Sequence, residues 1–429
     1  MATLIALGTQ WGDEGKGRIV DVLAEHADFV VRYQGGGNAG HTIVADGAEL
    51  TVRQVPAGIL RETTCVLGNG VALDPGRFLD EVDGLRARGI RVTPDNLVVS
   101  DRAHVTLPYH LDLDAPNDPV LQAAGLATTH HGIRPTYVDK VGRTGIRVSD
   151  LFDEELLRQK LSRNLEQKSA VLGAKARPID ELFELCCGWA EQAGPFVRDT
   201  VRLLNQALDA DKSVVFEGAQ ATGLDIDLGT YPFVTSSHTT AGGACIGTGV
   251  SPRRIDRVLG IAKAYITKVG DIDPFPSAMT EQTENDLRSQ LGESGGTEQN
   301  RIGWFDVEMV RYAAMVNGID ALAITKLDAL DGVESPQICV GYEYQGRRLE
   351  GVVSDQRALT ECRPVLEAMP GWGEPTTEAR RFEDLPENAR RYVERIAALC
   401  DLPIAILTVG RDRSATIIGD ASYVSRGIA

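Results

Sequence analysis

The sequence predicts an α/β fold built on one large, mostly parallel sheet with helices on both faces. Short apolar runs alternate with amphipathic helical stretches along the chain, which is typical of parallel sheets. The first apolar run leads into a glycine-rich loop with one lysine, so the fold is P-loop-NTPase-like. With 429 residues, of which 43% are hydrophobic and 24% charged, the chain has the composition of a globular protein.

Each element is expected from a local pattern. The short apolar runs predict strands, and the apolar residues that recur every three or four positions predict helices. The expected strands cover residues 3–7, 29–33, 213–216, 264–269, 321–325 and 404–409. The expected helices cover residues 19–24, 77–88, 154–172, 179–208, 305–317 and 388–399. We expect a single domain over residues 1–429, with smaller lobes or insertions at roughly 94–117 and 332–377, where the alternation is weakest.

Charge and cysteine content exclude several classes of protein. A net charge of −17 argues against binding to nucleic acid or to an anionic membrane surface, because both require an excess of cations. No stretch approaches the roughly 20 apolar residues of a membrane span, and the first residues lack the basic segment of a secretory signal. The seven cysteines are scattered and form no CxxC pair. We therefore expect a cytoplasmic protein with reduced thiols.

The loop at residues 8–17, GTQWGDEGKG, is the first candidate for chemistry. Glycines let backbone N–H groups approach a phosphate, the following helix contributes its positive end, and Lys16 adds a cation. The loop departs from the GxxxxGK[ST] pattern, since Gln10 and Gly17 stand where a glycine and a Ser/Thr are required. A purely structural turn is the alternative. The acidic Asp13 and Glu14 favour a functional loop, because a carboxylate beside phosphate requires a metal ion or a proton.

A second glycine-rich loop, QGGGNAGHT at residues 34–42, follows the next expected strand. Alone, it could be a mobile turn with a surface histidine. Two such loops after neighbouring strands favour convergence on one ligand. His41 could then donate a proton to, or stabilise charge on, a reacting phosphoryl group.

These two loops resemble those of the adenylosuccinate synthetase family. The resemblance continues, in order, through the threonine pair at 128–129 and the DK at 139–140, FEGAQ at 216–220, LDIDLGTYPFVTSSHTTAGGA at 224–244, KVGDIDPFP at 268–276, NGIDALAITKLDALDG at 317–332 and TVGRDR at 408–413. It implies a ligase that uses GTP to phosphorylate O6 of IMP. The amino group of aspartate then displaces the phosphate to give adenylosuccinate.

The resemblance also implies roles for individual residues. Asp13 matches the base that deprotonates N1 of IMP and lies beside Mg²⁺, His41 matches the acid, and Lys16 belongs with them in the catalytic set. The residues implied for GTP are Gly12, Gly15, Lys16, Gly17, Gly40, His41, Thr42, Lys326, Asp328 and Gly410, with the Gly40 carbonyl and Asp13 as Mg²⁺ ligands. Those implied for IMP are Asp13, Asn38, Thr129, Gln220, Thr235 and, across a homodimer interface, Arg143.

The expected amine-substrate loop departs from the family pattern. The family has an arginine where this chain has His131, and an arginine-rich loop before its Cys-Gly-Trp where this chain reads GGTEQNRIGW at 295–304. Glu298 stands in the position of the principal carboxylate-binding arginine, and only Arg301 remains. The candidate residues for the amine are therefore His131, Thr297, Glu298 and Arg301. A smaller departure is Arg411, where the family usually has proline.

Three functions remain open from the sequence. The altered loop could bind aspartate through Arg301, His130, His131 or Arg134. Alternatively, the chain is a paralogue that uses the same phosphoryl chemistry with another amine or a modified purine nucleotide, as in nucleoside secondary metabolism. A nucleotide-binding regulator without catalysis is the third possibility, and the joint presence of Asp13, Lys16 and His41 argues against it.

Overall fold

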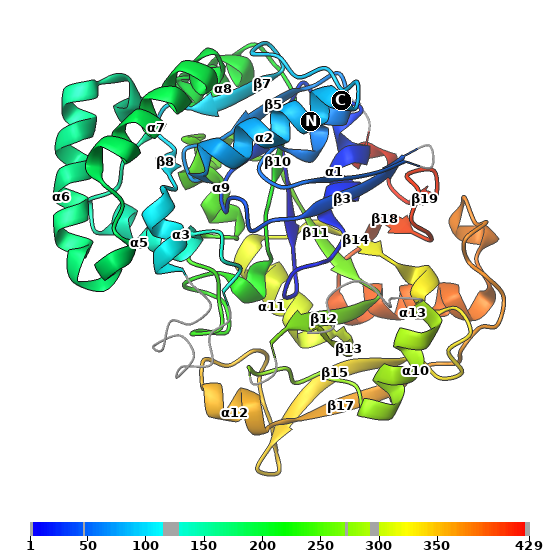
Figure 1. Cartoon of the computed structure of the whole chain (residues 1–429). Helices are drawn as coiled ribbons and strands as arrows, with labels where there is room; N and C mark the ends of the chain where they lie inside the picture. The colour runs from blue at the N-terminus through cyan, green and yellow to red at the C-terminus, as the bar shows by residue number, and fades with distance from the viewer. Residues whose placement is uncertain (1–2, 46–47, 115–127, 271–272, 292–299, 425–429) are drawn as a thin grey trace.

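The computed structural model describes residues 3–45, 48–114, 128–270, 273–291 and 300–424, and within these ranges the principal sheet has ten strands (Figure 1). Every neighbouring pair is parallel except the antiparallel edge pair β18–β19. From that edge the order is β19 (Thr416–Ile418), β18 (Ile404–Thr408), β14 (Ala321–Thr325), β11 (Arg257–Lys263), β1 (Thr3–Gly8), β10 (Val214–Glu217), β2 (Phe29–Arg32), β5 (Thr64–Leu67), β7 (Leu97–Ser100) and β9 (Val197–Arg198).

Helices cover both faces of this sheet, as the sequence predicts. Successive side chains of a strand point to opposite faces. Leu4 and Ala6 accordingly pack with helices α1 (Lys16–Ala24), α2 (Pro75–Ala87) and α7 (Ile179–Ala193). Ile5 and Leu7 pack on the other face with α8 (Thr200–Asp209), α11 (Val307–Asn317) and α13 (Glu387–Cys400). A strand buried on both faces must be apolar at every position, which explains the run at 3–7.

The carboxyl ends of the parallel strands lie at one edge of the sheet. The loops after β1, β2, β10, β11, β14 and β18 all begin there. In open α/β sheets, ligands bind at this edge, where connections diverge to opposite faces. Both glycine-rich loops begin at this edge.

A second, smaller sheet lies beside the first (Figure 1). It contains β12 (Tyr265–Val269), β13 (Asn300–Asp306), β15 (Gln337–Tyr344), β16 (Arg347–Arg348) and β17 (Arg363–Ala368). Helices α10 (Glu281–Leu291) and α12 (Gln356–Glu361) accompany it. The 332–377 stretch therefore contributes three strands to this sheet. Of the stretch expected at 94–117, residues 115–117 lie outside the described residues, and the rest contributes β7 to the principal sheet, followed by β8 (His104–Val105) and α3 (Pro108–Leu113).

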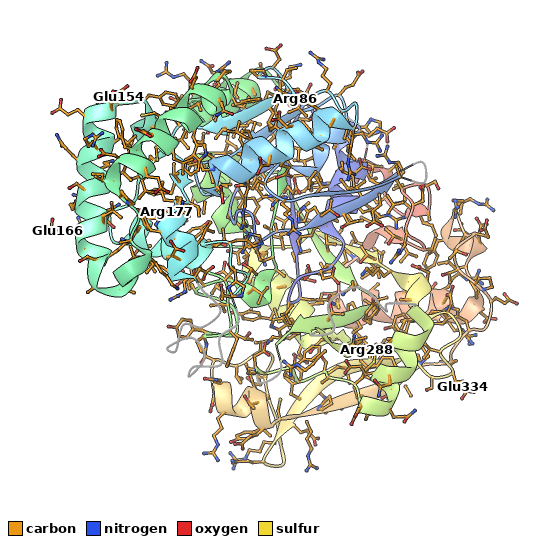
Figure 2. All side chains as sticks on the ribbon, in the orientation of Figure 1. Arg86, Glu154, Glu166, Arg177, Arg288 and Glu334 are labelled. Carbon is orange, nitrogen blue, oxygen red and sulfur yellow. The ribbon has the colours of Figure 1, made fainter. Side chains whose placement is uncertain are left out.

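The remaining elements flank the principal sheet. Two short ladders pair β3 (His41–Ala45) with β4 (Ala48–Val52) and β6 (Ala72–Leu73) with β8. The other α-helices of the described residues are α5 (Ile133–Val141), α6 (Glu154–Leu172) and α9 (Ala241–Thr248). Figure 2 shows Glu154 and Glu166 on the outer side of α6, both exposed, while Leu157 and Leu161 of the same helix are buried.

The structure corrects three expectations about elements. The single helix expected over 179–208 is two helices, because Gly194 and Pro195 interrupt it and Asp199 begins α8 by accepting the Arg202 N–H at 3.0 Å. The run at 264–269 forms β12 of the second sheet, where it pairs antiparallel with β13. The central strand β11 was not among the expected strands, although it lies between β1 and β14.

All seven cysteines are free thiols, and four of them are buried. Among the described residues, no helix has both the length and the apolar character needed to cross a bilayer.

Candidate active site

The 8–17 loop joins β1 to α1 through a series of left-handed residues. Gly12, Asp13 and Gly15 have φ values of 98°, 58° and 74°, and Gly15 immediately precedes the helix. Glu14 is fully buried inside this turn and accepts N–H bonds from Gln10 at 3.1 Å and Gly12 at 2.9 Å. Lys16 Nζ lies 2.6 Å from the second oxygen of Glu14. The loop thus holds an internal carboxylate with the N–H donors and the lysine that are expected to bind phosphate.

Asp13 lies on the open side of the loop, with 59% of its side chain exposed. Its Oδ2 is 2.9 Å from Lys263 Nζ and 3.7 Å from Lys326 Nζ. Partial desolvation alone would raise the pKa of Asp13, but Lys263, Lys326 and Lys16 outweigh it and hold that pKa well below its ordinary value. Asp13 is therefore ionised at neutral pH. The lysines that stabilise its charge come from β11, from the loop after β14 and from the start of α1.

The second loop places His41 against the start of α1. A Cβ atom at Gly17 would come within 2.6 Å of the His41 Cβ, so only glycine permits this approach. His41 Nδ1 makes a short contact with Glu217 Oε1 and lies 3.0 Å from Arg32 Nη2. Arg32 also pairs with Glu217 at 2.7 Å, and all three side chains are buried. This contact fixes Nδ1 and leaves Nε2 for a ligand.

Burial and Arg32 lower the pKa of His41 to about 4 despite the opposing effect of Glu217. The pKa of Glu217 falls to about 2, because Arg32 and His41 overcome the effect of its burial. Neutral His41 beside ionised Glu217 is therefore the form expected without a ligand. Anionic phosphates brought next to the ring would favour its protonated form.

The loop after β14 lies directly against the first loop. The Thr325 hydroxyl donates to the Glu14 carbonyl at 2.8 Å, and the Lys326 N–H donates to the Thr408 hydroxyl of β18 at 3.0 Å. Asp328 Oδ1 is buried without a hydrogen-bond partner among the described residues. Burial raises the pKa of Asp328, although Arg18 and Lys326 oppose that effect. An unsatisfied buried acceptor at this position points to a ligand that donates hydrogen bonds.

Two amide side chains converge near the second loop. A Cβ built on Gly35, whose φ is 78°, would lie 3.1 Å from Gln220 Oε1 and 3.6 Å from Asn38 Oδ1. Both oxygens are buried and lack a partner within the described ranges. Asn38 and Gln220 follow β2 and β10 respectively, so the parallel sheet brings them together. They are suited to bind a polar ligand beside His41.

The structure places the other expected residues as follows. Gly40 is exposed next to His41, the Gly410 carbonyl accepts a bond from Arg18, and the Thr42 hydroxyl bonds to Thr51 across β3 and β4. His131 contacts Arg77 and lies beside Gly37. Thr129 and Arg143 are exposed, and Thr235 is half-buried. No described contact joins these last three residues to Asp13 or His41, and Thr297 and Glu298 lie outside the described residues.

Arg301 lies on β13 and is bound to an internal carboxylate. Its Nη2 is 2.5 Å from Asp273 Oδ1 and 2.8 Å from the Asp273 carbonyl oxygen. Lys268 Nζ lies 2.8 Å from the other Asp273 oxygen. The arginine expected to receive the amine substrate thus already holds a partner.

Sequence reasoning missed four residues of this site: Arg32, Glu217, Lys263 and Asp273. Each had a visible signal. Arg32, Glu217 and Lys263 are buried charged residues at the ends of β2, β10 and β11, and a charged side chain in such a place requires a partner. Asp273 lies in the KVGDIDPFP motif at 268–276 that contributes to the family resemblance. These signals could have pointed to each charged residue, but they do not show which residue is its partner.

Comparison with known proteins decides the family. A sequence model of the adenylosuccinate synthetase family matches residues 5–417. The adenylosuccinate synthetases of Carboxydothermus hydrogenoformans and Moorella thermoacetica are 48% and 47% identical to this chain, over 99% of it and 100% of their own lengths. The chain belongs to the adenylosuccinate synthetase family.

The solved structure of fully ligated adenylosuccinate synthetase from Plasmodium falciparum has the same fold, with a TM-score of 0.90 at 33% identity. The match covers 97% of this chain and 99% of that one. Membership of the adenylosuccinate synthetase family makes the protein a ligase with a GTP-binding site, as the resemblance implied.

Proposed function

We propose that this enzyme forms adenylosuccinate, GDP and phosphate from IMP, aspartate and GTP. The observation that carries the proposal is the meeting of two glycine-rich loops at one sheet edge, with ionised Asp13 on one and a positioned His41 on the other. Family membership over nearly the whole chain supports it. Nothing in the comparisons favours the other amine or the inactive regulator considered from the sequence.

Asp13 acts as the base. Its carboxylate takes the proton from N1 of IMP, which increases the electron density on O6 so that O6 attacks the γ-phosphorus of GTP. Lys263 and Lys326 hold Asp13 in place. The bond between the γ-phosphorus and the β–γ bridging oxygen breaks, GDP leaves, and IMP carries a 6-phosphoryl group. The amino group of aspartate then forms the new bond to C6, and phosphate departs with the O6 electrons.

His41 stabilises the charge on the transferring phosphoryl group through Nε2. Glu217 and Arg32 fix its Nδ1 side, and the phosphates of GTP promote protonation of the ring. Lys16 and the N–H groups of Gly15 and Gly17 hold the phosphates. For Lys16 to do so, its bond to Glu14 has to be shared with or replaced by phosphate oxygen.

The buried acceptors that lack a partner in the described part of the chain determine which nucleotides bind. The Asp328 carboxylate accepts the N1–H and 2-amino hydrogens of guanine, which adenine lacks in that arrangement. Gln220 and Asn38 hold IMP through their side-chain amides, whose buried oxygens have no partner among the described residues, together with Thr129 and Thr235.

Magnesium fits the donor set beside the loop. Asp13 offers an exposed carboxylate and Gly40 an exposed carbonyl, and hard oxygen donors suit Mg²⁺. When bound there with the phosphates of GTP, Mg²⁺ would neutralise part of their negative charge.

A homodimer is also part of the proposal. Arg143 is exposed and follows α5, whose Val138 and Val141 are 61% and 80% exposed. An exposed apolar helix face beside the arginine suits a partner subunit, which would carry Arg143 into the neighbouring IMP site. The seven free thiols agree with a cytoplasmic enzyme.

The test is identification of the product by mass spectrometry after incubation with GTP, Mg²⁺, IMP and aspartate. We expect adenylosuccinate, with one GDP released for each molecule formed. Omission of IMP should abolish GDP release. GDP release that does not depend on IMP, or the absence of adenylosuccinate at saturating aspartate, would contradict the proposal.

A further inference from the structure

A cluster of one carboxylate and two cations is formed by Lys268 of β12, by Asp273 shortly after that strand, and by Arg301 of β13, which belongs to the expected amine loop. Asp273 is 7% exposed and shares its two oxygens between Arg301 and Lys268. Lys268 and Arg301 lie opposite each other in the antiparallel register of β12 and β13. Gly270, with φ 101°, allows the carboxylate to fold back, because a Cβ atom there would lie 2.9 Å from Asp273 Oδ1.

Aromatic contacts join this cluster to the phosphate loop. The Lys268 ammonium lies 4.9 Å from the Trp11 ring, and the Arg301 guanidinium lies 5.2 Å from the Phe275 ring. Trp11 and Phe275 pack edge to face with centroids 5.8 Å apart. Trp11 is two residues before Asp13, so the cluster packs against the loop that carries the base.

The members of the cluster differ in access. Lys268 is 2% exposed and also donates to the Pro274 carbonyl at 2.6 Å. Arg301 is 25% exposed, and its buried Nε has no hydrogen-bond partner within the described part of the chain. Arg301 is therefore the cation of the cluster that can donate a hydrogen bond to a further acceptor. Asp273 already occupies its Nη2.

We propose that Asp273 is a specificity-determining residue of the amine subsite. It occupies Nη2 of Arg301, so a carboxylate of the incoming aspartate binds this arginine either at Nε, beside the negative charge of Asp273, or by displacing Asp273 from Nη2. This inference rests on the proposed function, since it takes Arg301 as part of the amine site. Displacing an internal charge-assisted bond and opposing a like charge both weaken the binding of an amine that carries carboxylates.

The test is a double-mutant cycle on the full-length enzyme with Asp273→Asn, Arg301→Ala and both together, read as the KM for aspartate. Asp273→Asn is expected to lower this KM by at least about tenfold, the ratio that one charge-assisted bond supplies. The KM values for GTP and IMP should stay unchanged. Arg301→Ala should alter the aspartate KM less than about threefold in the wild-type background but cancel the gain in the Asp273→Asn background.

Two further variants keep the experiment decisive. Lys268→Met combined with Asp273→Asn removes one charge of each sign, so it tests the same release of Arg301 if the single variant does not fold. Glu367→Gln is the matched control. It breaks a bidentate pair in which the two oxygens of Glu367 accept bonds of 2.7 and 2.8 Å from Arg395, outside the cluster of Asp273, Lys268 and Arg301. It should leave the aspartate KM unchanged.

An unchanged or higher aspartate KM in both Asp273 variants would overturn the proposal. So would an equal effect of Arg301→Ala in the two backgrounds, since Arg301 would then bind aspartate despite Asp273. Failure of the proposed function looks different, because the wild-type enzyme would then make no adenylosuccinate at any aspartate concentration.

Discussion

At the scale of single residues, the site is organised by charged groups that neutralise one another in the absence of substrate. Glu14 holds Lys16, Glu217 holds Arg32 and His41, and Lys263 holds Asp13. A buried charge without a partner is costly, so these pairs allow the site to fold before its ligands arrive. Under the proposed function, phosphates and purine would exchange partners with groups that are already in position.

Asp13→Asn should reduce turnover by several powers of ten and change the KM for GTP by less than about tenfold, because the lost step is proton removal rather than binding. Steady-state kinetics with IMP and saturating aspartate measure both constants. Asp95→Asn, at an exposed loop position, is the control. Near-normal turnover in the Asp13 variant would show that another group is the base.

Asp328→Asn should weaken GTP by roughly ten- to a hundredfold, because an amide donor would face a guanine donor at a cost of about 1–3 kcal/mol. Xanthosine triphosphate should gain, since its 2-oxo group accepts a bond from asparagine. The ratio of kcat/KM for the two nucleotides is the measurement. An unchanged ratio would mean that the buried oxygen of Asp328 does not contact the base.

At the scale of elements, helix boundaries follow local chemistry. The break between α7 and α8 depends on Gly194 and Pro195, and the restart depends on Asp199, which bonds the Arg202 N–H. The placement of strands in the second sheet does not follow from local chemistry. β12 and β13 pair through contacts between residues far apart in the chain, and neither strand's own residues specify this pairing. Local signals therefore determine where elements end, and tertiary packing determines which sheet receives them.

Asp199→Ala should lower the free energy of unfolding by about 1 kcal/mol, the usual contribution of a helix N-cap. Urea denaturation followed by circular dichroism measures the change. Glu191→Ala, at an exposed position inside α7, should have almost no effect. A loss in the control equal to that in the Asp199 variant would show that the effect does not come from the cap.

At the scale of the whole molecule, Asp306 links the second sheet to helix α11, which packs on the principal sheet. It is fully buried at the end of β13, caps α11 through the Met309 N–H at 3.1 Å, and accepts the Tyr342 hydroxyl of β15 at 2.7 and 2.8 Å. Burial raises the pKa of Asp306 to about 6 despite these hydrogen bonds. The folded protein thus holds a proton that the unfolded chain releases near pH 4.

The stability of the wild type should therefore include a component that is present below pH 4 and is lost as the pH rises towards 6. Its size is about 3 kcal/mol at most, from about 1.4 kcal/mol for each unit of pKa. Asp306→Asn removes this titration while keeping an acceptor for Met309. The free energy of unfolding of the wild type should fall relative to that of Asp306→Asn as the pH rises from 4 to 7, and a constant difference would contradict the raised pKa.

The sequence by itself determined the α/β class, the two glycine-rich loops and the candidate residues Asp13, Lys16 and His41. These features depend on local patterns, namely apolar runs long enough for strands and glycines that allow left-handed turns. The order of motifs along the chain also indicated the family, which the comparisons confirm. The strands expected at 3–7, which reaches Gly8 in the structure, and at 321–325 followed from composition because both faces of these strands are buried.

Only the tertiary structure decided which charged groups meet. Lys263 comes from β11, 250 positions from Asp13, and Glu217 comes from β10, 176 positions from His41. Arg301 was expected to be ready for substrate, yet it binds Asp273 across 28 positions. A sequence shows that a buried charge requires a partner, but the choice of partner depends on strand order and register, which arise from contacts far apart along the chain.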